Sequence, residues 1–233
     1  MSKGDIVTSP LGEMIVLIDV GQRVLLDNPV VRVWDVALDP SEIQPWHLHH
    51  NPYVVLSLEA SPGRMDWLDG GESRYLDEYA GGAVYRPTSP VHRLTNIGDA
   101  HYRNHLVEFK DLGEKRDHAV DIGPGERSVP GARPPGGPEA DGRERVIDAP
   151  HVRVWEVLVP AQGSSRLELT DLPHLTVPFV APDLEKDPAA GVAFHTAGEV
   201  ELFNPTDVAA RYFVVELTYL ARLESIVADQ ERT

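Results

Sequence analysis

The 233-residue sequence has no cysteine, and its 37 acidic residues outnumber its 21 basic ones. The lack of cysteine excludes disulfides, thiolate metal ligands and thiol redox chemistry. The formal net charge of −16 argues against a nucleic-acid partner or an anionic membrane surface, because phosphate groups are bound by basic patches. We therefore interpret the acidity as the property of a solvated surface.

Long hydrophobic runs are also missing. The apolar run at 14–20 is short and is interrupted by Asp19. No stretch approaches the ~20 apolar residues of a membrane span. We therefore expect no signal peptide, no contact with a membrane and a cytoplasmic location. Phosphate-binding loops, dinucleotide fingerprints and nucleophile elbows are absent as well, so the chemistry must be sought in other residues.

The sequence is instead rich in short segments typical of β-strands. Its 20 prolines and 19 glycines separate apolar runs in which Val, Tyr, Phe and Leu are frequent. Many short strands at regular spacing indicate an all-β sandwich or barrel. The expected strands are 30–38, 53–58, 83–86, 105–109, 151–159, 175–180 and 212–220, with turns at 69–72 and 96–99 and a modest helical pattern at 222–230.

Two histidines stand two positions apart directly before one of these strands. If Pro45–Tyr53 is extended, side chains alternate between its faces, so His47 and His49 point to the same side. A third histidine, His92, lies in a second polar stretch at 87–96. We predict that the three histidines bind one divalent metal ion. Three protein ligands leave coordination positions open, as catalytic metal sites do.

These stretches resemble the two motifs of the cupin superfamily. The first motif reads G-x5-H-x-H-x3/4-E-x6-G and the second G-x5-P-x-G-x2-H-x3-N. The second is matched by Gly81, Pro87, His92 and Asn96, with serine in place of its second glycine, and the first by the histidine pair. The glutamate ligand of the first motif is missing, and Tyr53 stands where it would fall. The resemblance implies an all-β chain built from cupin-type double-stranded β-helix (jelly-roll) barrels.

The sequence also repeats itself. Residues 28–36 are echoed by 149–157, and residues 104–109 by 212–217. Between them lies a Pro/Gly-rich segment that cannot form a core and is typical of a linker. We expect a duplicated chain, similar to a bicupin, with a barrel at 1–121, a linker at 122–143 and a second barrel at 144–233.

The repeat indicates which residues serve the framework. Asn96 is matched by Asn204, and the pairs Arg32/Arg153 and Trp34/Trp155 also recur in both halves. The histidines do not recur. His47 aligns with Glu168, His49 with Thr170, His92 with Val200, and Tyr53 with His174. We therefore predict that the second barrel has lost its metal ligands and supports the first by packing.

The resemblance implies a metal-dependent enzyme that acts on a small oxygenated or carboxylated metabolite. Within the superfamily, three-histidine iron sites resemble those of thiol and diketone dioxygenases. We therefore favour Fe(II) as the metal, with Zn, Ni or Mn as alternatives. A lyase or isomerase that does not use O₂ stays open, as does a non-catalytic small-molecule-binding protein. The expected partner is a small-molecule substrate, and a homodimer is possible.

Two further residues are candidates for catalysis. Tyr53 could donate a hydrogen bond or a proton at the site, or could be a core aromatic residue. His105 could transfer protons, although a buried histidine paired with Glu108 or a carbonyl is the commoner case. His50 could replace the missing glutamate as a fourth ligand, but alternation along the strand turns it away from His49 and towards solvent.

Overall fold

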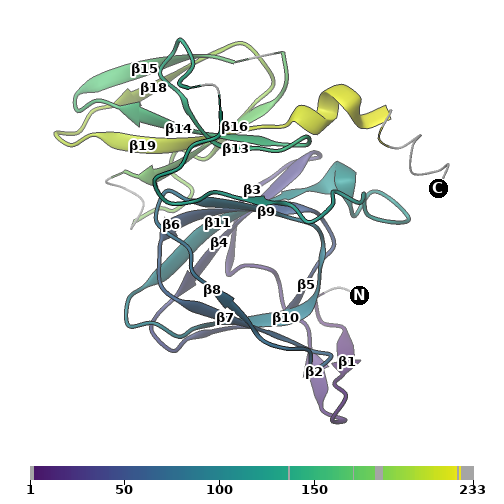
Figure 1. Cartoon of the computed structure of the whole chain (residues 1–233). Helices are drawn as coiled ribbons and strands as arrows, with labels where there is room; N and C mark the ends of the chain where they lie inside the picture. The colour runs from purple at the N-terminus through teal and green to yellow at the C-terminus, as the bar shows by residue number, and fades with distance from the viewer. Residues whose placement is uncertain (1–2, 136, 170, 182–185, 225, 227–233) are drawn as a thin grey trace. The chain divides into compact units, whose positions relative to one another are not determined.

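A computed structural model describes residues 3–135, 137–169, 171–181, 186–224 and 226. The chain divides into two units, Met1–Ala80 with Arg86–Pro124, and Gly81–Tyr85 with Gly125–Thr233. Both consist of antiparallel strands with short 3₁₀ turns (Figure 1). The all-β prediction is confirmed. The exact boundaries at 121 and 143 stay a prediction.

The first unit contains two four-stranded arrays in the orders β5-β10-β7-β8 and β6-β11-β4-β3. Its elements are β1 (Ile6–Thr8), β2 (Met14–Val16), β3 (Arg23–Asp27), β4 (Val31–Leu38), β5 (Ile43–His49), β6 (Tyr53–Glu59), β7 (Gly63–Trp67), β8 (Arg74–Leu76), β10 (Ser89–Asn96), β11 (Tyr102–Phe109) and the 3₁₀ turn η1 (Lys110–Leu112). Strands β1 and β2 form a separate hairpin that projects from this unit (Figure 1).

The second unit has a five-stranded sheet in the order β13-β14-β19-β16-β17 and a pair β15-β18. Its elements are β9 (Ala83–Arg86, with Arg86 assigned to the first unit), β12 (Glu126–Arg127), β13 (Glu144–Asp148), β14 (Arg153–Val159), β15 (Gly163–Glu168), β16 (His174–Val180), β17 (Ala193–His195), β18 (Glu199–Asn204), β19 (Ala210–Glu216) and the 3₁₀ turn η2 (Thr218–Arg222). The predicted strand 212–220 therefore ends at Glu216, and the chain turns into η2. The predicted helix at 222–230 falls mostly outside the described residues.

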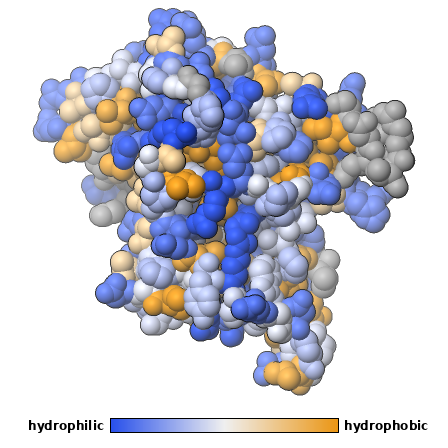
Figure 2. Space-filling model, in the orientation of Figure 1, coloured by the Kyte–Doolittle hydropathy of each residue, from blue (hydrophilic) through white to orange (hydrophobic). Residues whose placement is uncertain are grey.

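Alternation along β4 and β11 builds the core of the first unit. Val36 and Leu38 face inwards and pack with Leu94 and Tyr102, whereas Trp34 packs with Leu106, Val20 and Tyr53. β-branched and aromatic side chains suit such a pleated, half-buried surface. The visible face of the molecule carries mostly hydrophilic side chains with small apolar groups between them, in keeping with the net charge (Figure 2).

The repeat is visible as matched contacts in the two units. Arg32 Nη1 lies 3.5 Å from Glu108 Oε2, and Arg153 Nη1 lies 3.5 Å from Glu216 Oε2. Both glutamates are buried. Because the same pair recurs in a unit that does not share the histidines, it belongs to the framework of the fold.

The two matched asparagines hold the same kind of turn. The Asn96 amide donates to Leu38 O (3.0 Å) and Ala100 O (2.8 Å), and its Oδ1 accepts from the Gly98 amide (3.1 Å). Asn204 donates to three carbonyls and accepts from the Thr206 amide in the corresponding turn. The asparagine of the second motif therefore closes the turn after the strand that carries His92.

Candidate metal centre

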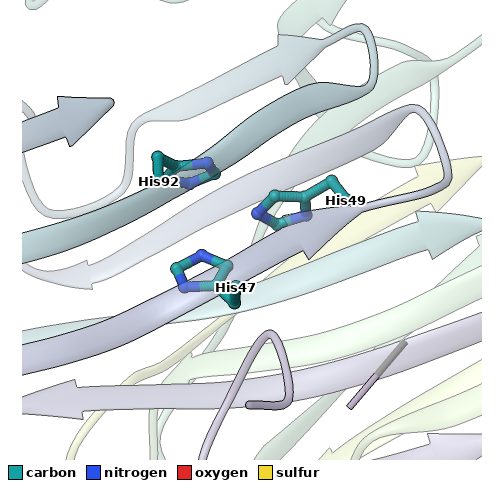
Figure 3. A group of neighbouring side chains, drawn as sticks. All are labelled: His47, His49 and His92. Atoms are coloured by element: carbon teal, nitrogen blue, oxygen red, sulfur yellow. The ribbon is translucent and has the colours of Figure 1, made fainter. Parts of the chain in front are cut away.

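Three histidine side chains converge on one point inside the first unit. His47 and His49 extend from β5 and His92 from the neighbouring β10, and the rings point towards one another (Figure 3). His47 and His92 are register partners across the two strands. Candidate ligand nitrogens of the three residues all lie within 4.8 Å of one another. Among the described residues this is the one cluster of three or more His, Asp or Glu side chains with such spacing.

Two of the rings are held in a defined tautomer. His47 Nδ1 lies 2.7 Å from Pro45 O, and His92 Nδ1 lies 2.7 Å from Pro90 O. A carbonyl oxygen only accepts, so both Nδ1 atoms carry the proton and both Nε2 atoms keep a lone pair. This backbone contact orients the ring, as the outer hydrogen bond of a metal-ligating histidine commonly does.

The third ring has an unsatisfied nitrogen. His49 Nδ1 is buried and has no hydrogen-bond partner among the described residues. An orphaned buried polar nitrogen is costly unless something binds it. Three imidazoles that lack a carboxylate partner, with one nitrogen unsatisfied, fit a divalent metal ion.

Burial keeps the three rings neutral. It lowers the pKa of His47 to about 3, with a further contribution from His92. Burial also lowers the pKa of His49 well below its usual range, and it lowers that of His92. Neutral imidazole is the form that binds metals, so the cluster is ready to ligate without losing protons.

Tyr53 lies against this cluster. Its ring stacks on His49 with the centroids 4.1 Å apart and an angle of 18° between the planes. Its hydroxyl lies 3.0 Å from Ser89 Oγ. Burial raises the pKa of Tyr53 to about 12, so the hydroxyl stays protonated. The structure thus brings Tyr53, which occupies the sequence position of the missing glutamate, together with the candidate metal ligands.

His105 is not brought to this cluster. It alternates along β11 with Leu106, which packs with Tyr53 on the inner face, so His105 lies on the opposite face of the sheet. There its Nε2 is 3.4 Å from Asp35 Oδ1, and Arg103 pairs with the same carboxylate at 3.0 Å. The alternative of pairing with Glu108 is not what the structure shows. Because the sheet separates His105 from the three histidines, we leave it out of the site.

A cavity of about 550 Å³ opens beside the cluster. Its volume falls in the range of small-molecule sites. It is lined by His49, His50, Thr88, Gly113, Glu114, Arg116, Asp117, His118 and Ala119. His118 is exposed and lines this cavity from the segment that follows η1. A second cavity, of about 490 Å³, lies between the N-terminal segment and Trp34 and does not include the three histidines.

The inner wall also carries a polar network that sequence reasoning did not single out. The Tyr102 hydroxyl donates to Glu78 Oε2 at 2.9 Å, and Asn104 donates to the Tyr102 hydroxyl at 2.9 Å. Ser57 Oγ lies 3.4 Å from the same carboxylate oxygen. The signal was the polar alternation Tyr102-x-Asn104 within a buried strand, which places both side chains on one face.

In the second unit, the described residues at the aligned positions do not form such a cluster. Glu168 is exposed at the end of β15, and Val200 lies on β18. Thr170 is outside the described residues. His174, aligned with Tyr53, is buried and its Nδ1 lies 2.6 Å from Leu172 O.

No family model and no curated protein matches the sequence. Solved structures do resemble the fold. A cupin domain from Bordetella pertussis Tohama I is 22% identical, with 47% of this chain and 98% of that chain covered and a TM-score of 0.35. AerE from Microcystis aeruginosa is 6% identical, with coverages of 84% and 96% and a TM-score of 0.53. Salicylate 1,2-dioxygenase from Pseudaminobacter salicylatoxidans is 12% identical, with coverages of 86% and 77% and a TM-score of 0.44.

The two units have the antiparallel all-β architecture expected of cupin-type jelly-roll barrels, and AerE shares this fold over 84% of the chain. At these identities the likeness concerns the fold, and the chemistry must be argued from this chain's own residues. No helix within the described residues is long and apolar enough to cross a membrane.

Proposed function

We propose that this chain is a metal-dependent enzyme that acts on a small oxygenated or carboxylated metabolite, most simply as a non-haem Fe(II) dioxygenase. The observation that supports this is the buried cluster of His47, His49 and His92 beside an open cavity. These three residues would hold the metal. When bound, it would supply Lewis-acid activation of an oxygen donor and, as Fe(II), the redox chemistry by which O₂ oxidises the substrate, with the electrons coming from the substrate.

The chain's own residues have defined tasks in this proposal. The carbonyls of Pro45 and Pro90 fix two imidazoles with Nε2 free. Tyr53 packs on His49 and keeps its hydroxyl protonated near the site, so it can donate a hydrogen bond to the substrate. Trp67, whose ring centroid is 5.5 Å from that of His92, adds an apolar wall that excludes water.

A lyase or isomerase that does not use O₂ is the second candidate. The protonated Tyr53 hydroxyl favours it, because a proton donor beside a Lewis acid can protonate an enolate or a leaving group. Imidazole ligands suit Zn, Ni and Mn as well as Fe, so the donor set is compatible with either reaction. A non-catalytic binding protein would use the same cavity without turnover.

Metal content is the test of the site. Purified wild type, after anaerobic loading with Fe(II), is expected to hold about one equivalent by elemental analysis, and His49→Ala is expected to lose it. His50→Ala is the matched control, because His50 is the adjacent histidine and does not belong to the three-histidine cluster. Metal retained in His49→Ala, or none in the wild type, would contradict the proposal. Loss in both variants would instead make His50 a fourth ligand.

The reaction is tested next with the loaded protein. An oxygen electrode with a panel of diketones and aromatic diols should show O₂ consumption if the Fe(II) dioxygenase is right. Product formation without O₂ consumption, with Zn, Ni or Mn bound, would support the lyase or isomerase. Stoichiometric ligand binding without any product would support the third hypothesis, a non-catalytic binding protein.

A further inference from the structure

An arginine on the inner face of the first barrel has no assigned role. Arg74 begins β8 and is the register partner of Met65 on β7, and Leu76 of the same strand packs on the core cluster around Leu94. Side chains alternate along a strand, so Arg74 shares the inward face with Leu76. Between them, Tyr75 points outwards and is 70% exposed.

The Arg74 guanidinium is half-buried, and it has no hydrogen bond or ion pair with a described residue. Its neighbours differ. Arg64 and Arg93, which alternate to the outer face of the same sheet, both pair with Asp66, at 3.0 and 3.1 Å. The carboxylate nearest in sequence on the inner side, Glu78, is already engaged by Tyr102 and Ser57. A partly desolvated guanidinium that forms no ion pair with the described residues is able to bind an anionic group of a ligand.

Arg74 also lies within reach of the three histidines that are the candidate metal ligands. On β7, Trp67 is the register partner of His92, and Met65, two residues away, is that of Arg74. Strand spacing places the Arg74 and His92 Cα atoms about 10 Å apart across the sheet and 7 Å along it. Both side chains extend from the same inward face, and the long arginine side chain can bend towards the histidines, so a small organic molecule can span this gap.

We propose that Arg74 binds a carboxylate of the substrate at the end remote from the oxygen atoms that face His47, His49 and His92. Guanidinium and carboxylate form a planar, two-bonded pair, which would orient the substrate as well as hold it. This inference rests on the proposed metal-dependent function and narrows its substrate class to small acids with a separate metal-binding oxygen group. Neutral ligands of the same shape bind more weakly.

The test compares two probes that differ only at the remote end. 2-Oxoglutarate and 2-oxovalerate share a 2-oxoacid group and chain length, but only the former has a distal carboxylate. Binding to the metal-loaded protein is measured by calorimetry and by tryptophan fluorescence for wild type, Arg74→Gln, Arg74→Lys and the matched control Arg64→Gln. We expect the wild type to prefer 2-oxoglutarate by about tenfold or more, the usual effect of a charge-assisted pair.

The variants separate charge from fold. Arg74→Gln should lose the preference while its affinity for 2-oxovalerate stays unchanged. Arg74→Lys should keep part of the preference, and Arg64→Gln should keep all of it. Equal affinity of the wild type for both probes, or an unchanged preference in Arg74→Gln, would overturn the inference.

Metal content is measured in every sample, because it separates the two proposals. If the wild type binds no metal, the proposed function fails. The Arg74 inference is then judged on the metal-free protein with glutarate, whose binding must again weaken in Arg74→Gln and not in Arg64→Gln. If metal binds normally but Arg74→Gln has no effect, only the inference about Arg74 fails.

Discussion

The substitution Asn96→Ala separates the framework of the second motif from its chemistry. Asn96 is fully buried and makes three hydrogen bonds, two as donor to backbone carbonyls and one as acceptor from the Gly98 amide. Each neutral hydrogen bond contributes about 1 kcal/mol, so their loss should cost about 3 kcal/mol of unfolding free energy. With a urea slope of about 2 kcal/mol/M, the midpoint should fall by about 1.5 M.

The assay is urea unfolding followed by tryptophan fluorescence, combined with metal analysis under native conditions. Asn96→Ala should lose stability and keep its metal, because its amide contacts backbone and not the histidine rings. Asn204→Ala is the internal comparison, and we expect a loss of at least similar size from the second unit, where Asn204 makes the corresponding contacts and donates to one further carbonyl. A midpoint shift below about 0.5 M, or loss of metal before any loss of stability, would refute the framework role.

Two further predictions concern Tyr53 and Asp35. Tyr53→Phe keeps the stack on His49 but removes the hydroxyl. Metal content should therefore persist, while turnover on the substrate found in the assays above should fall about 100-fold. Unchanged turnover would exclude proton donation by Tyr53. Burial alone would raise the pKa of Asp35, but His105 and Arg103 hold it below its ordinary value of 3.8. The ionised carboxylate therefore contributes its full stabilisation above pH 3.8. This stabilisation is lost as the pH falls through the lower pKa of the folded state. The stability difference between wild type and Asp35→Asn, measured by urea unfolding, should therefore be constant above about pH 5 and shrink in more acidic solution; a constant difference down to pH 2 would contradict this.

The sequence alone predicted the fold class, the duplication and the grouping of His47, His49 and His92. These predictions rest on features that can be read from the sequence without knowing its tertiary contacts: the two-residue period of a strand, motif spacing and a repeated pattern. The strand end at 220 was wrong, because the chain turns into η2 after Glu216 although its residues suit a strand. Its side-chain pattern did not show where the ladder stops.

The roles of Arg74 and His105 needed the structure. Alternation shows which residues share a face, but not whether that face points into the barrel or away from it. His105 and Leu106 are both buried, so composition did not tell which of them faces Tyr53. Arg74 lies on a three-residue strand beside a turn, where a charged side chain is usually solvated.

His47 and His92 are partners across β5 and β10, so the three ligands come together only when these two strands pair in the correct register. A slip of one residue between these strands would turn one histidine to the outside and leave the metal with an incomplete ligand set. A bound metal ion would therefore stabilise only the correct alignment, adding its binding free energy to that one pairing. The ion would then contribute to folding as well as to chemistry, because it would favour the arrangement of strands in which its own site exists.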